Sequence, residues 1–271
     1  MGTFLTMTPS RRAAAADARI LDADPDLVAG LDPEQAELAT QQALARVHYI
    51  ERGPWRPKTS GAPGPDLIGL LLLEGLIVRT LAIAERSSTE ILGAGDLLRP
   101  WQRDGEDGLV PTRVEWRVLD RARVALLDGR FAASIAPWPQ IGAALVGRAL
   151  RRARWQGVLA TFSHMTRVDQ RLLLLFWHFA ERWGRVRPDG VVVRLPLTHE
   201  TLGALIGTRR PSVTSALSAL AEQGLLEPLD RGEWMLTEAA GRWLEELRDA
   251  TEAGRGEWPA SLEERRGRRA A

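Results

Sequence analysis

Two neighbouring arginines and a proline are the residues of this 271-residue chain whose chemistry is easiest to name. Arg209 and Arg210 flank the start of a helix that Pro211 is suited to open, because the missing N–H of a proline costs little there. When such a helix enters the major groove of DNA, an arginine can donate two hydrogen bonds to O6 and N7 of a guanine. Hydroxyl and imidazole groups nearby can bond phosphates. The candidate DNA-contacting residues are Thr198, His199, Arg209, Arg210, Ser212, Val213, Thr214, Ser215 and Arg231.

These residues need two short helices to position them. Thr198 is a typical N-cap, Glu200 suits the first turn, and Gly207 is suited to end the first helix. In the second helix the apolar residues recur at i, i+3, i+4 and i+7, so they must face inward: Val213, Ala216, Leu217 and Leu220. This spacing predicts a helix-turn-helix, and an ordinary αα-hairpin is the alternative.

The sequence after the second helix has the pattern of a wing. Leu225–Leu229 and Glu233–Leu236 flank the turn signal Asp230-Arg231-Gly232, which predicts a β-hairpin. Thr237–Arg248 then predicts one more helix. Val191–Leu195 predicts a short strand before the motif. Arg231 on the wing could reach a phosphate.

Upstream, short apolar runs separated by glycine and polar turns extend from Leu67 to Phe131, and each run is a predicted strand: Leu67–Leu73, Leu76–Ile83, Thr89–Leu92, Val114–Leu119 and Arg123–Leu127. They predict an antiparallel β barrel or sandwich, because the intervening segments are too short for the crossover helices of an α/β domain. Asp24–Leu44 predicts short helices.

Pro137–Met165 predicts a long helix with two apolar stripes. One could lie on the β domain and the other on a second subunit, and an ordinary intrachain helix is the alternative. Arg148 and Arg152 interrupt the first stripe, so no clean coiled-coil seam is expected there. The stripes are Ile141, Leu145, Trp155, Leu159 and Phe162, and Val146, Ala149, Leu150, Ala153, Gly157 and Ala160.

Composition narrows the function classes. The net charge is +1, and residues 185–249 hold ten acidic residues against eight arginines, so a DNA footprint must come from asymmetry between faces. An adaptor that uses a winged helix to bind protein rather than DNA is therefore the alternative function.

The absence of cysteine excludes iron–sulfur clusters. No phosphate-binding glycine loop, zinc motif or nucleophile elbow is present, so no enzymatic activity is expected. No apolar run reaches the about 20 residues of a membrane span, and we expect a cytoplasmic protein.

In these features the chain resembles the Crp–Fnr superfamily of bacterial regulators. The likeness is strongest in residues 197–226, where Arg209-Arg210-Pro211-Ser212-Val213-Thr214 resembles one recognition-helix subgroup. A weaker likeness in Ile91–Leu98 matches the strand and turn before the family's ligand pocket. The resemblance implies an α+β fold with an N-terminal double-stranded β-helix (jelly-roll) sensor domain, a long dimerisation helix and a C-terminal winged helix-turn-helix. It also implies a homodimer, a palindromic operator and RNA polymerase as a partner. The expected boundaries are residues 1–18 (flexible), 19–136 (sensor-like), 137–165 (dimerisation helix), 166–249 (DNA-binding) and 250–271 (flexible tail).

The chain also departs from that family. Pro211 and Ser215 stand where many members have Glu and Arg, so the operator sequence cannot be carried over. No Arg-Ser-Ala or Arg-Thr-Ala segment follows Gly95-Asp96, so the sensor domain resembles a degenerate cyclic-nucleotide domain and no cyclic nucleotide is expected. Haem is not expected either, since the histidines have no suggestive spacing and His178 lies in a very apolar helix. The effector, the operator and the direction of regulation stay open. The four histidines are His48, His164, His178 and His199.

Overall fold

The computed structural model describes residues 16–57, 67–101, 110–162, 164–254 and 258–259. The chain divides into two compact units, Met1–Leu159 and Ala160–Ala271. Within the described ranges, no helix is both long enough and apolar enough to cross a membrane.

The first unit begins with a strand and three short helical segments. Asp32 caps α2 by accepting a hydrogen bond from the backbone N–H of Gln35 (2.9 Å), which confirms the helical prediction for this stretch. β1 pairs with β2, so residues 16–18, which were predicted to be flexible, form a strand instead. The elements are β1 (Ala16–Arg19), α1 (Ile20–Ala23), the 3₁₀ turn η1 (Pro25–Val28) and α2 (Pro33–Gln42).

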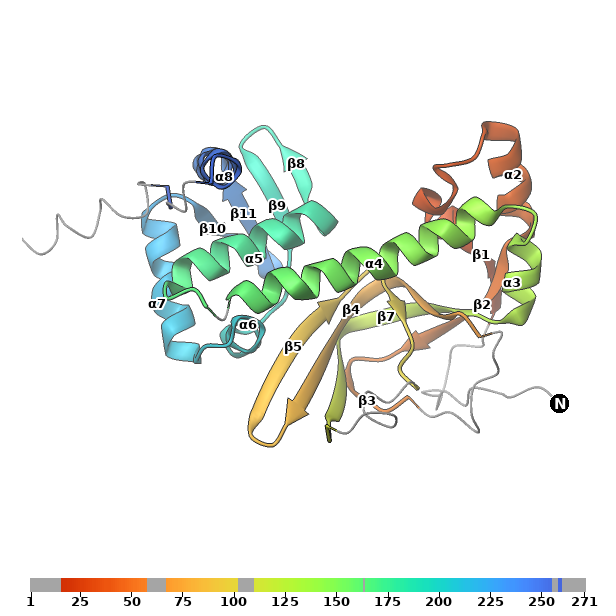
Figure 1. Ribbon diagram of the computed structural model, residues 1–271, viewed down its shortest axis with the longest axis horizontal. Helices are drawn as coiled ribbons and strands as arrows, with labels where there is room; N and C mark the ends of the chain where they lie inside the picture. The colour runs from red at the N-terminus through yellow and green to blue at the C-terminus, as the bar shows by residue number, and fades with distance from the viewer. Residues whose placement is uncertain (1–15, 58–66, 102–109, 163, 255–257, 260–271) are drawn as a thin grey trace, which may run out of the picture. The chain divides into compact units, whose positions relative to one another are not determined.

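An antiparallel sheet forms the body of this unit (Figure 1). Its main strands run in the order β1-β2-β7-β4-β5, β3 pairs with β7, and β6 pairs with β4. Antiparallel pairing throughout is what short apolar runs joined by tight turns produce. The strands are β2 (Leu44–Ile50), β3 (Gly53–Trp55), β4 (Gly69–Ile83), β5 (Arg86–Leu92), β6 (Leu97–Leu98) and β7 (Arg113–Leu127).

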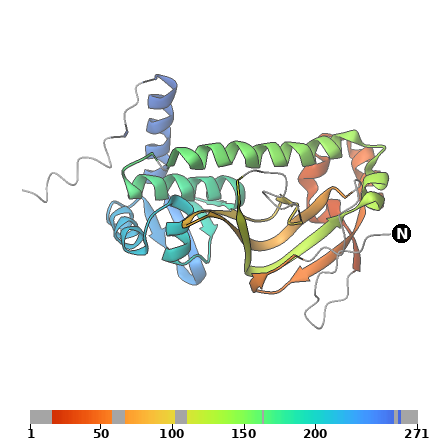
Figure 2. The same ribbon diagram turned by 60° about the horizontal axis from the view of Figure 1, so that its bottom comes forward.

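The two longest strands differ from the prediction. Residues 67–73 and 76–83 were predicted as separate strands, but both lie in β4, and the runs 114–119 and 123–127 likewise form the single strand β7. The β4–β7 register shifts between Leu72 and Ile77, where Gly75 has φ +93°. A bulge of this kind bends a strand without ending it, and Figure 2 shows the curvature.

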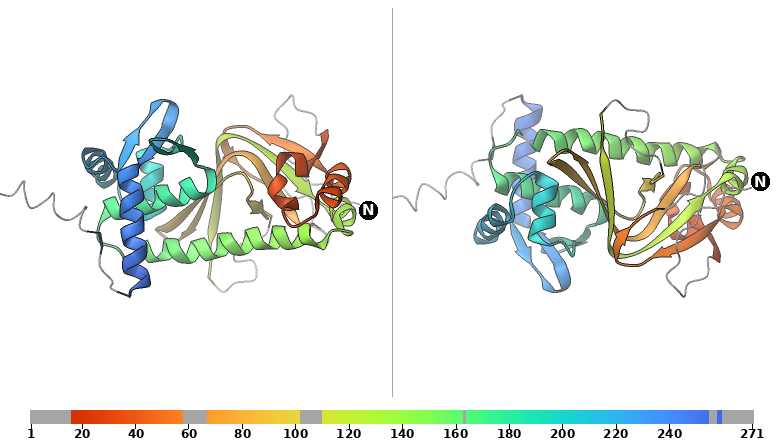
Figure 3. Two further views of the ribbon diagram at one scale, coloured as in Figure 1. Left: turned by 90° about the horizontal axis from the view of Figure 1, so that it is seen from above. Right: turned by 90° about the horizontal axis from the view of Figure 1, so that it is seen from below.

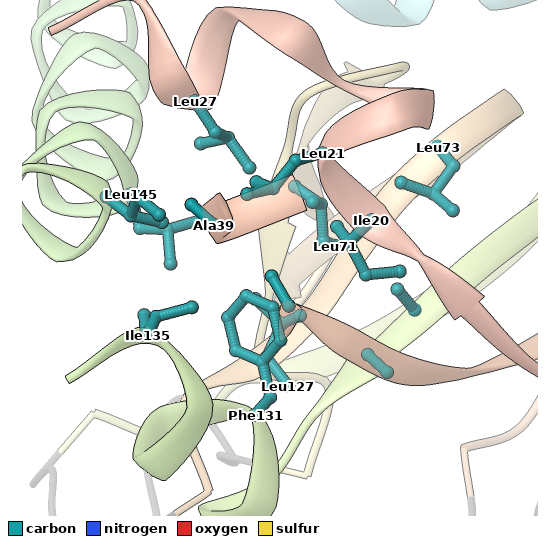
Figure 4. Packing of buried hydrophobic residues seen from close by; sticks show 14 of the residues in the cluster. Ile20, Leu21, Leu27, Ala39, Leu71, Leu73, Leu127, Phe131, Ile135 and Leu145 are labelled. Carbon is teal, nitrogen blue, oxygen red and sulfur yellow. The ribbon is translucent and has the colours of Figure 1, made fainter. Parts of the chain in front are cut away.

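Residues 69–73 of β4 are buried on both faces of the sheet, because their alternate side chains enter different cores. Leu71 and Leu73 face a cluster completed by the N-terminal helices, α3 (Gly129–Ile135) and the start of α4 (Pro139–Phe162). Figure 4 shows Phe131 and Leu145 in this cluster pointing toward Leu71 and Leu21. The second core contains Trp55, Trp101 and nine aliphatic residues, listed from the sheet as Ile50, Leu70, Leu72, Ile77, Leu92, Leu98, Val118, Ala122 and Val124.

α4 lies on the first unit through one face, with Ile141 and Leu145 buried. Its opposite face carries the exposed seam, spaced alternately by three and four residues: Ala143, Val146, Leu150, Ala153, Gly157 and Ala160. Val146 is 59% exposed and Leu150 is 63% exposed. The seam keeps five residues of the predicted second stripe, has Ala143 in place of Ala149, and follows the spacing of a heptad repeat. Arg148 and Arg152 lie on the other side of the helix, where both bind groups of the β domain.

The second unit combines four helices and a four-stranded sheet in the order β10-β11-β9-β8. The strand predicted at 191–195 is β9, and it is preceded by a strand, β8, that the sequence did not reveal. Figure 3 shows the β10–β11 hairpin projecting from the helices of this unit. The elements are α5 (Val168–Trp183), β8 (Arg185–Arg187), β9 (Gly190–Arg194), α6 (His199–Ile206), α7 (Arg210–Glu222), β10 (Leu226–Pro228), the 3₁₀ turn η2 (Asp230–Gly232), β11 (Glu233–Thr237) and α8 (Glu238–Glu252).

The C-terminal boundary also differs from the prediction. Residues 250–252, assigned to a flexible tail, continue α8. Trp258 stacks on Trp243 with ring centroids 6.2 Å apart. Residues 255–257 and 260–271 of the predicted tail lie outside the described residues. With an antiparallel β domain, a long helix and a winged helix-turn-helix, the architecture confirms the predicted α+β fold class.

Candidate nucleic-acid interface

The first helix of the motif forms as its sequence predicts. The Thr198 hydroxyl accepts a hydrogen bond from the backbone N–H of Thr201 over 3.1 Å, which satisfies one unpaired donor at the start of α6. Leu202, Leu205 and Ile206 are buried, and Gly207 ends the helix in the left-handed conformation at φ +68°. An L-residue other than glycine is disfavoured at that dihedral.

The turn between α6 and α7 is tight because Gly203 has no side chain. The backbone N–H of Thr208 donates to the carbonyl oxygen of Gly203 over 2.8 Å. A Cβ atom at Gly203 would lie only 2.6 Å from the carbonyl oxygen of Thr208. From α5, Arg171 donates a 3.0 Å hydrogen bond to the carbonyl oxygen of Ile206 and so caps the end of α6. Sequence reasoning missed Arg171, because nothing in its neighbourhood indicates a partner 35 residues away.

The second helix buries one face and exposes the other. Val213, Ala216, Leu217 and Leu220 are buried, which confirms the predicted inner face. Six of the predicted DNA-contacting residues lie exposed, at the start of α6 or along the first turns of α7: Thr198, Arg209, Arg210, Ser212, Thr214 and Ser215. The structure thus brings these groups together on one small helical pair.

Val213 differs from its prediction as a contact residue. Its side chain is fully buried, since the same periodicity that places Ser212 and Thr214 outward turns Val213 toward the core. Its Cγ2 atom lies 3.4 Å from where a Cβ of Gly203 would stand. Val213 therefore supports the packing of α7 on α6 and has no surface to offer a base.

Side-chain hydrogen bonds organise the exposed face. His199 Nδ1 lies 2.9 Å from Thr214 Oγ1, which links the first turn of α6 to α7. The Thr214 hydroxyl also donates to the carbonyl oxygen of Arg210 (3.2 Å), and the Ser215 hydroxyl donates to that of Pro211 (3.3 Å). Both hydroxyl oxygens keep acceptor capacity.

The charge at the start of α7 suits an anion. Arg209 and Arg210 are exposed, and the segment from Arg209 to Ala221 holds no acidic residue. The helix dipole adds positive potential at the same end. This local asymmetry coexists with the acidic excess of residues 185–249.

The wing carries the last predicted residue. β10 and β11 pair antiparallel, and the backbone N–H of Leu229 donates to the carbonyl oxygen of Glu233 over 2.8 Å, closing the turn. Arg231 is exposed at φ +57°, a conformation that few residues other than glycine adopt. Its exposed guanidinium could reach a backbone phosphate beside the groove.

The β domain holds the turn that resembles the family's ligand loop. Asp96 is buried, and its carboxylate accepts a 2.8 Å hydrogen bond from the backbone N–H of Gly93. Arg79, an arginine of the same sheet, pairs with Glu90 at 2.8 Å. Residues 102–109, where the family's phosphate-binding segment would fall, lie outside the described residues. Within the described ranges no three His, Asp or Glu side chains group as metal ligands.

His178, predicted to be a core residue, is buried in α5. Burial and the nearby charge of Arg182 lower the pKa of its imidazole from 6.5 to about 3. The ring is therefore neutral at physiological pH.

Residues 166–241 match the model of the Crp-like helix-turn-helix domain. Among curated proteins nothing matches the chain. Three solved structures share its fold. A CooA mutant from Carboxydothermus hydrogenoformans aligns at TM-score 0.54 and 18% identity, over 87% of this chain and 96% of that one.

The second is FixK2 from Bradyrhizobium japonicum, at TM-score 0.51 and 17% identity over 71% of this chain and 92% of that one. The third is a cyclic nucleotide-binding domain containing protein from Listeria monocytogenes, at TM-score 0.57 and 12% identity over 71% and 89%. The chain thus carries a Crp-like helix-turn-helix domain, and its fold is similar to those of these three structures.

Proposed function

We propose that this protein is a sequence-specific, DNA-binding transcriptional regulator that acts as a homodimer on a palindromic operator. The observation that carries the proposal is the exposed start of α7, where Arg209 and Arg210 stand beside exposed hydroxyls on a rigidly capped helix pair. A helix presented in this way can enter the major groove with its first residues against the bases.

The exposed seam of α4 supports the dimer. A heptad row of small and aliphatic side chains on a helix is buried when a second such helix lies against it. The alanines and Gly157 allow close approach of two backbones, and Val146 and Leu150 supply apolar area. A two-fold pair of recognition helices then reads two half-sites about one helical turn of DNA apart, which requires a palindrome.

A cyclic nucleotide has no part in the proposal. Its phosphate needs an arginine fork and backbone N–H donors. The guanidinium of Arg79 forms an ion pair with the carboxylate of Glu90, and the second core of the β domain consists of packed aliphatic and tryptophan side chains. RNA polymerase is the proposed partner at a promoter. We also propose that the recognition helix belongs to the subgroup that residues 209–214, Arg-Arg-Pro-Ser-Val-Thr, resemble.

Selection of bound fragments from a random duplex pool tests the function. We expect an enriched inverted repeat, and an affinity for it that falls steeply and log-linearly with salt, since phosphate contacts release counterions. A fluorescence-anisotropy titration from low to physiological salt measures this. Absence of duplex binding at low salt would overturn the proposal and favour the protein-binding adaptor, which the acidic excess of residues 185–249 suggests.

A further inference from the structure

Glu90 is a buried carboxylate held by three side chains from two other elements. It lies on β5 and is 7% exposed. Arg79 on β4 donates to its Oε1 over 2.8 Å. Arg152 on α4 binds both carboxylate oxygens, at 2.5 Å and 3.3 Å, and Gln156 on α4 donates to Oε2.

The same face of α4 has further polar contacts with the β domain. Arg152 also donates to the carbonyl oxygen of Leu97 over 3.2 Å. Arg148 pairs with Asp24 and donates to the carbonyl oxygen of Gly95 over 3.3 Å. Arg148, Arg152 and Gln156 are spaced by four residues, so they form one stripe along the helix.

The charge state of Glu90 is set by this surrounding. Burial alone would raise the pKa of the carboxyl group, but hydrogen bonds and the charges of Arg152 and Arg79 outweigh it and hold the pKa below its ordinary value. Glu90 is thus an anion at physiological pH. Without it, two partly buried guanidinium groups would lose their counter-charge, which is strongly unfavourable.

The polar stripe and the exposed seam lie on opposite sides of the same turns of α4. Leu150, Ala153 and Gly157 of the seam are exposed, whereas the side chains of Arg148 and Arg152 are largely covered by their partners. The contacts of the polar stripe fix the rotation of α4 about its own axis, and this rotation sets the direction in which Leu150 and Ala153 point. An anion between Arg79 and Arg152 therefore determines how α4 presents the seam.

We propose that Glu90 is a built-in anionic ligand, which locks α4 in the rotation that exposes the seam and so makes dimer formation and operator binding independent of an external anion. This inference rests on the proposed function, because it concerns how the same regulator is kept competent. A chain of this kind needs no small anionic effector to order its long helix.

Chemical rescue tests the proposal. Glu90→Ala leaves two arginines around a space of carboxylate size, and Glu90→Gln fills that space without charge. We expect both full-length variants to lose at least about tenfold in dimer affinity, measured by sedimentation, and in operator affinity. Sodium acetate, compared with sodium chloride at equal ionic strength, should restore Glu90→Ala and leave Glu90→Gln unchanged. Glu74→Ala is the matched control, because Glu74 is an exposed carboxylate that pairs with Arg123 at 3.2 Å.

The alternative outcomes overturn the proposal. Wild-type dimer and operator affinity in Glu90→Gln would do so, as would a folded Glu90→Ala that acetate does not restore. If Glu90→Ala fails to fold, hydrogen exchange of residues 146–159 in Glu90→Gln tests the proposal instead. Protection unchanged from the wild type would show that Glu90 does not fix the position of α4. A wild-type protein that binds no duplex refutes the proposed function alone, because dimerisation and hydrogen exchange still test the role of Glu90.

Discussion

Thr208 donates its backbone N–H to the carbonyl oxygen of Gly203 over 2.8 Å, across the turn that joins the two helices of the candidate interface. The Thr208 carbonyl comes back so close that a Cβ on Gly203 would stand 2.6 Å from its oxygen. This contact fixes where α7 begins relative to α6. The direction of Arg209 and Arg210 therefore depends on a residue that has no side chain.

Gly203→Ala should destabilise the second unit. The methyl group must push the Thr208 carbonyl away, and overpacking of this kind costs about 1–3 kcal/mol. Urea unfolding of the full chain measures the loss, and operator affinity should fall with it. Gly241→Ala is the matched control, since no atom lies within 4 Å of a Cβ there and alanine favours the α8 helix by up to about 1 kcal/mol. Equal stability of the two variants would contradict the close-approach account.

Arg210→Ala should weaken operator binding by about 1–3 kcal/mol and relax the base preference at one position of each half-site. The reason is the loss of two hydrogen bonds to a guanine, while the helix itself keeps its buried face. Fluorescence anisotropy with the selected operator and with single-base variants measures both effects. Arg248→Ala, an exposed arginine on α8, controls for the change in net charge. If Arg210→Ala discriminates among the base variants as the wild type does, Arg210 reads no base.

Much of the helix-turn-helix could be predicted because its determinants are local. The Thr198 cap, the left-handed Gly207 and the apolar spacing from Val213 to Leu220 all act within a few residues of each other. The one error on α7, the inclusion of Val213 as a contact residue, came from treating a contiguous sequence motif as a surface.

The β domain was harder to predict because its determinants are distant in sequence. Glu74-Gly75 resembles a turn, but a bulge lets β4 continue past it once β7 lies alongside. Arg148 and Arg152 were interpreted as interruptions of an apolar stripe, since Glu90 lies 62 residues from Arg152. Only the folded chain brings the carboxylate to the arginine, and only then is the seam on the other side of α4 recognisable.

Leu150→Glu should abolish the proposed dimer. A carboxylate at the centre of the seam would meet its own symmetry mate across a helix pair, and both charges would lose their hydration there. Light scattering coupled to size exclusion should give the monomer mass, and operator affinity should fall because one helix reads only one half-site. Arg151→Glu places the same charge on a neighbouring position outside the seam and should leave the mass unchanged. A dimer that survives Leu150→Glu requires another interface.

His178 should make the second unit sensitive to acid well above the range in which carboxyl groups titrate. Its pKa is about 3 in the folded chain and near 6.5 when the chain is unfolded, so between these values the unfolded state binds one more proton. The free energy of unfolding should therefore decrease as the pH falls below about 6.5, by at most about 1.4 kcal/mol per pH unit from this group.

The contribution of neutral His178 to stability is fully present above the pKa of its imidazole in the unfolded chain. It is lost progressively as the pH falls toward the pKa in the folded chain. Urea unfolding between about pH 5 and 7 measures the slope, in a range where Glu90 and Asp169 stay ionised because their pKa values are lowered. His178→Gln removes this titrating group and should reduce the slope, and the remainder comes from His48, whose pKa is also lowered by burial and by the charge of Arg46. His164→Gln, an exposed histidine, should leave it as in the wild type. Parallel slopes in His178→Gln and the wild type would mean that the imidazole is solvated in the native state, contrary to its burial in the structure.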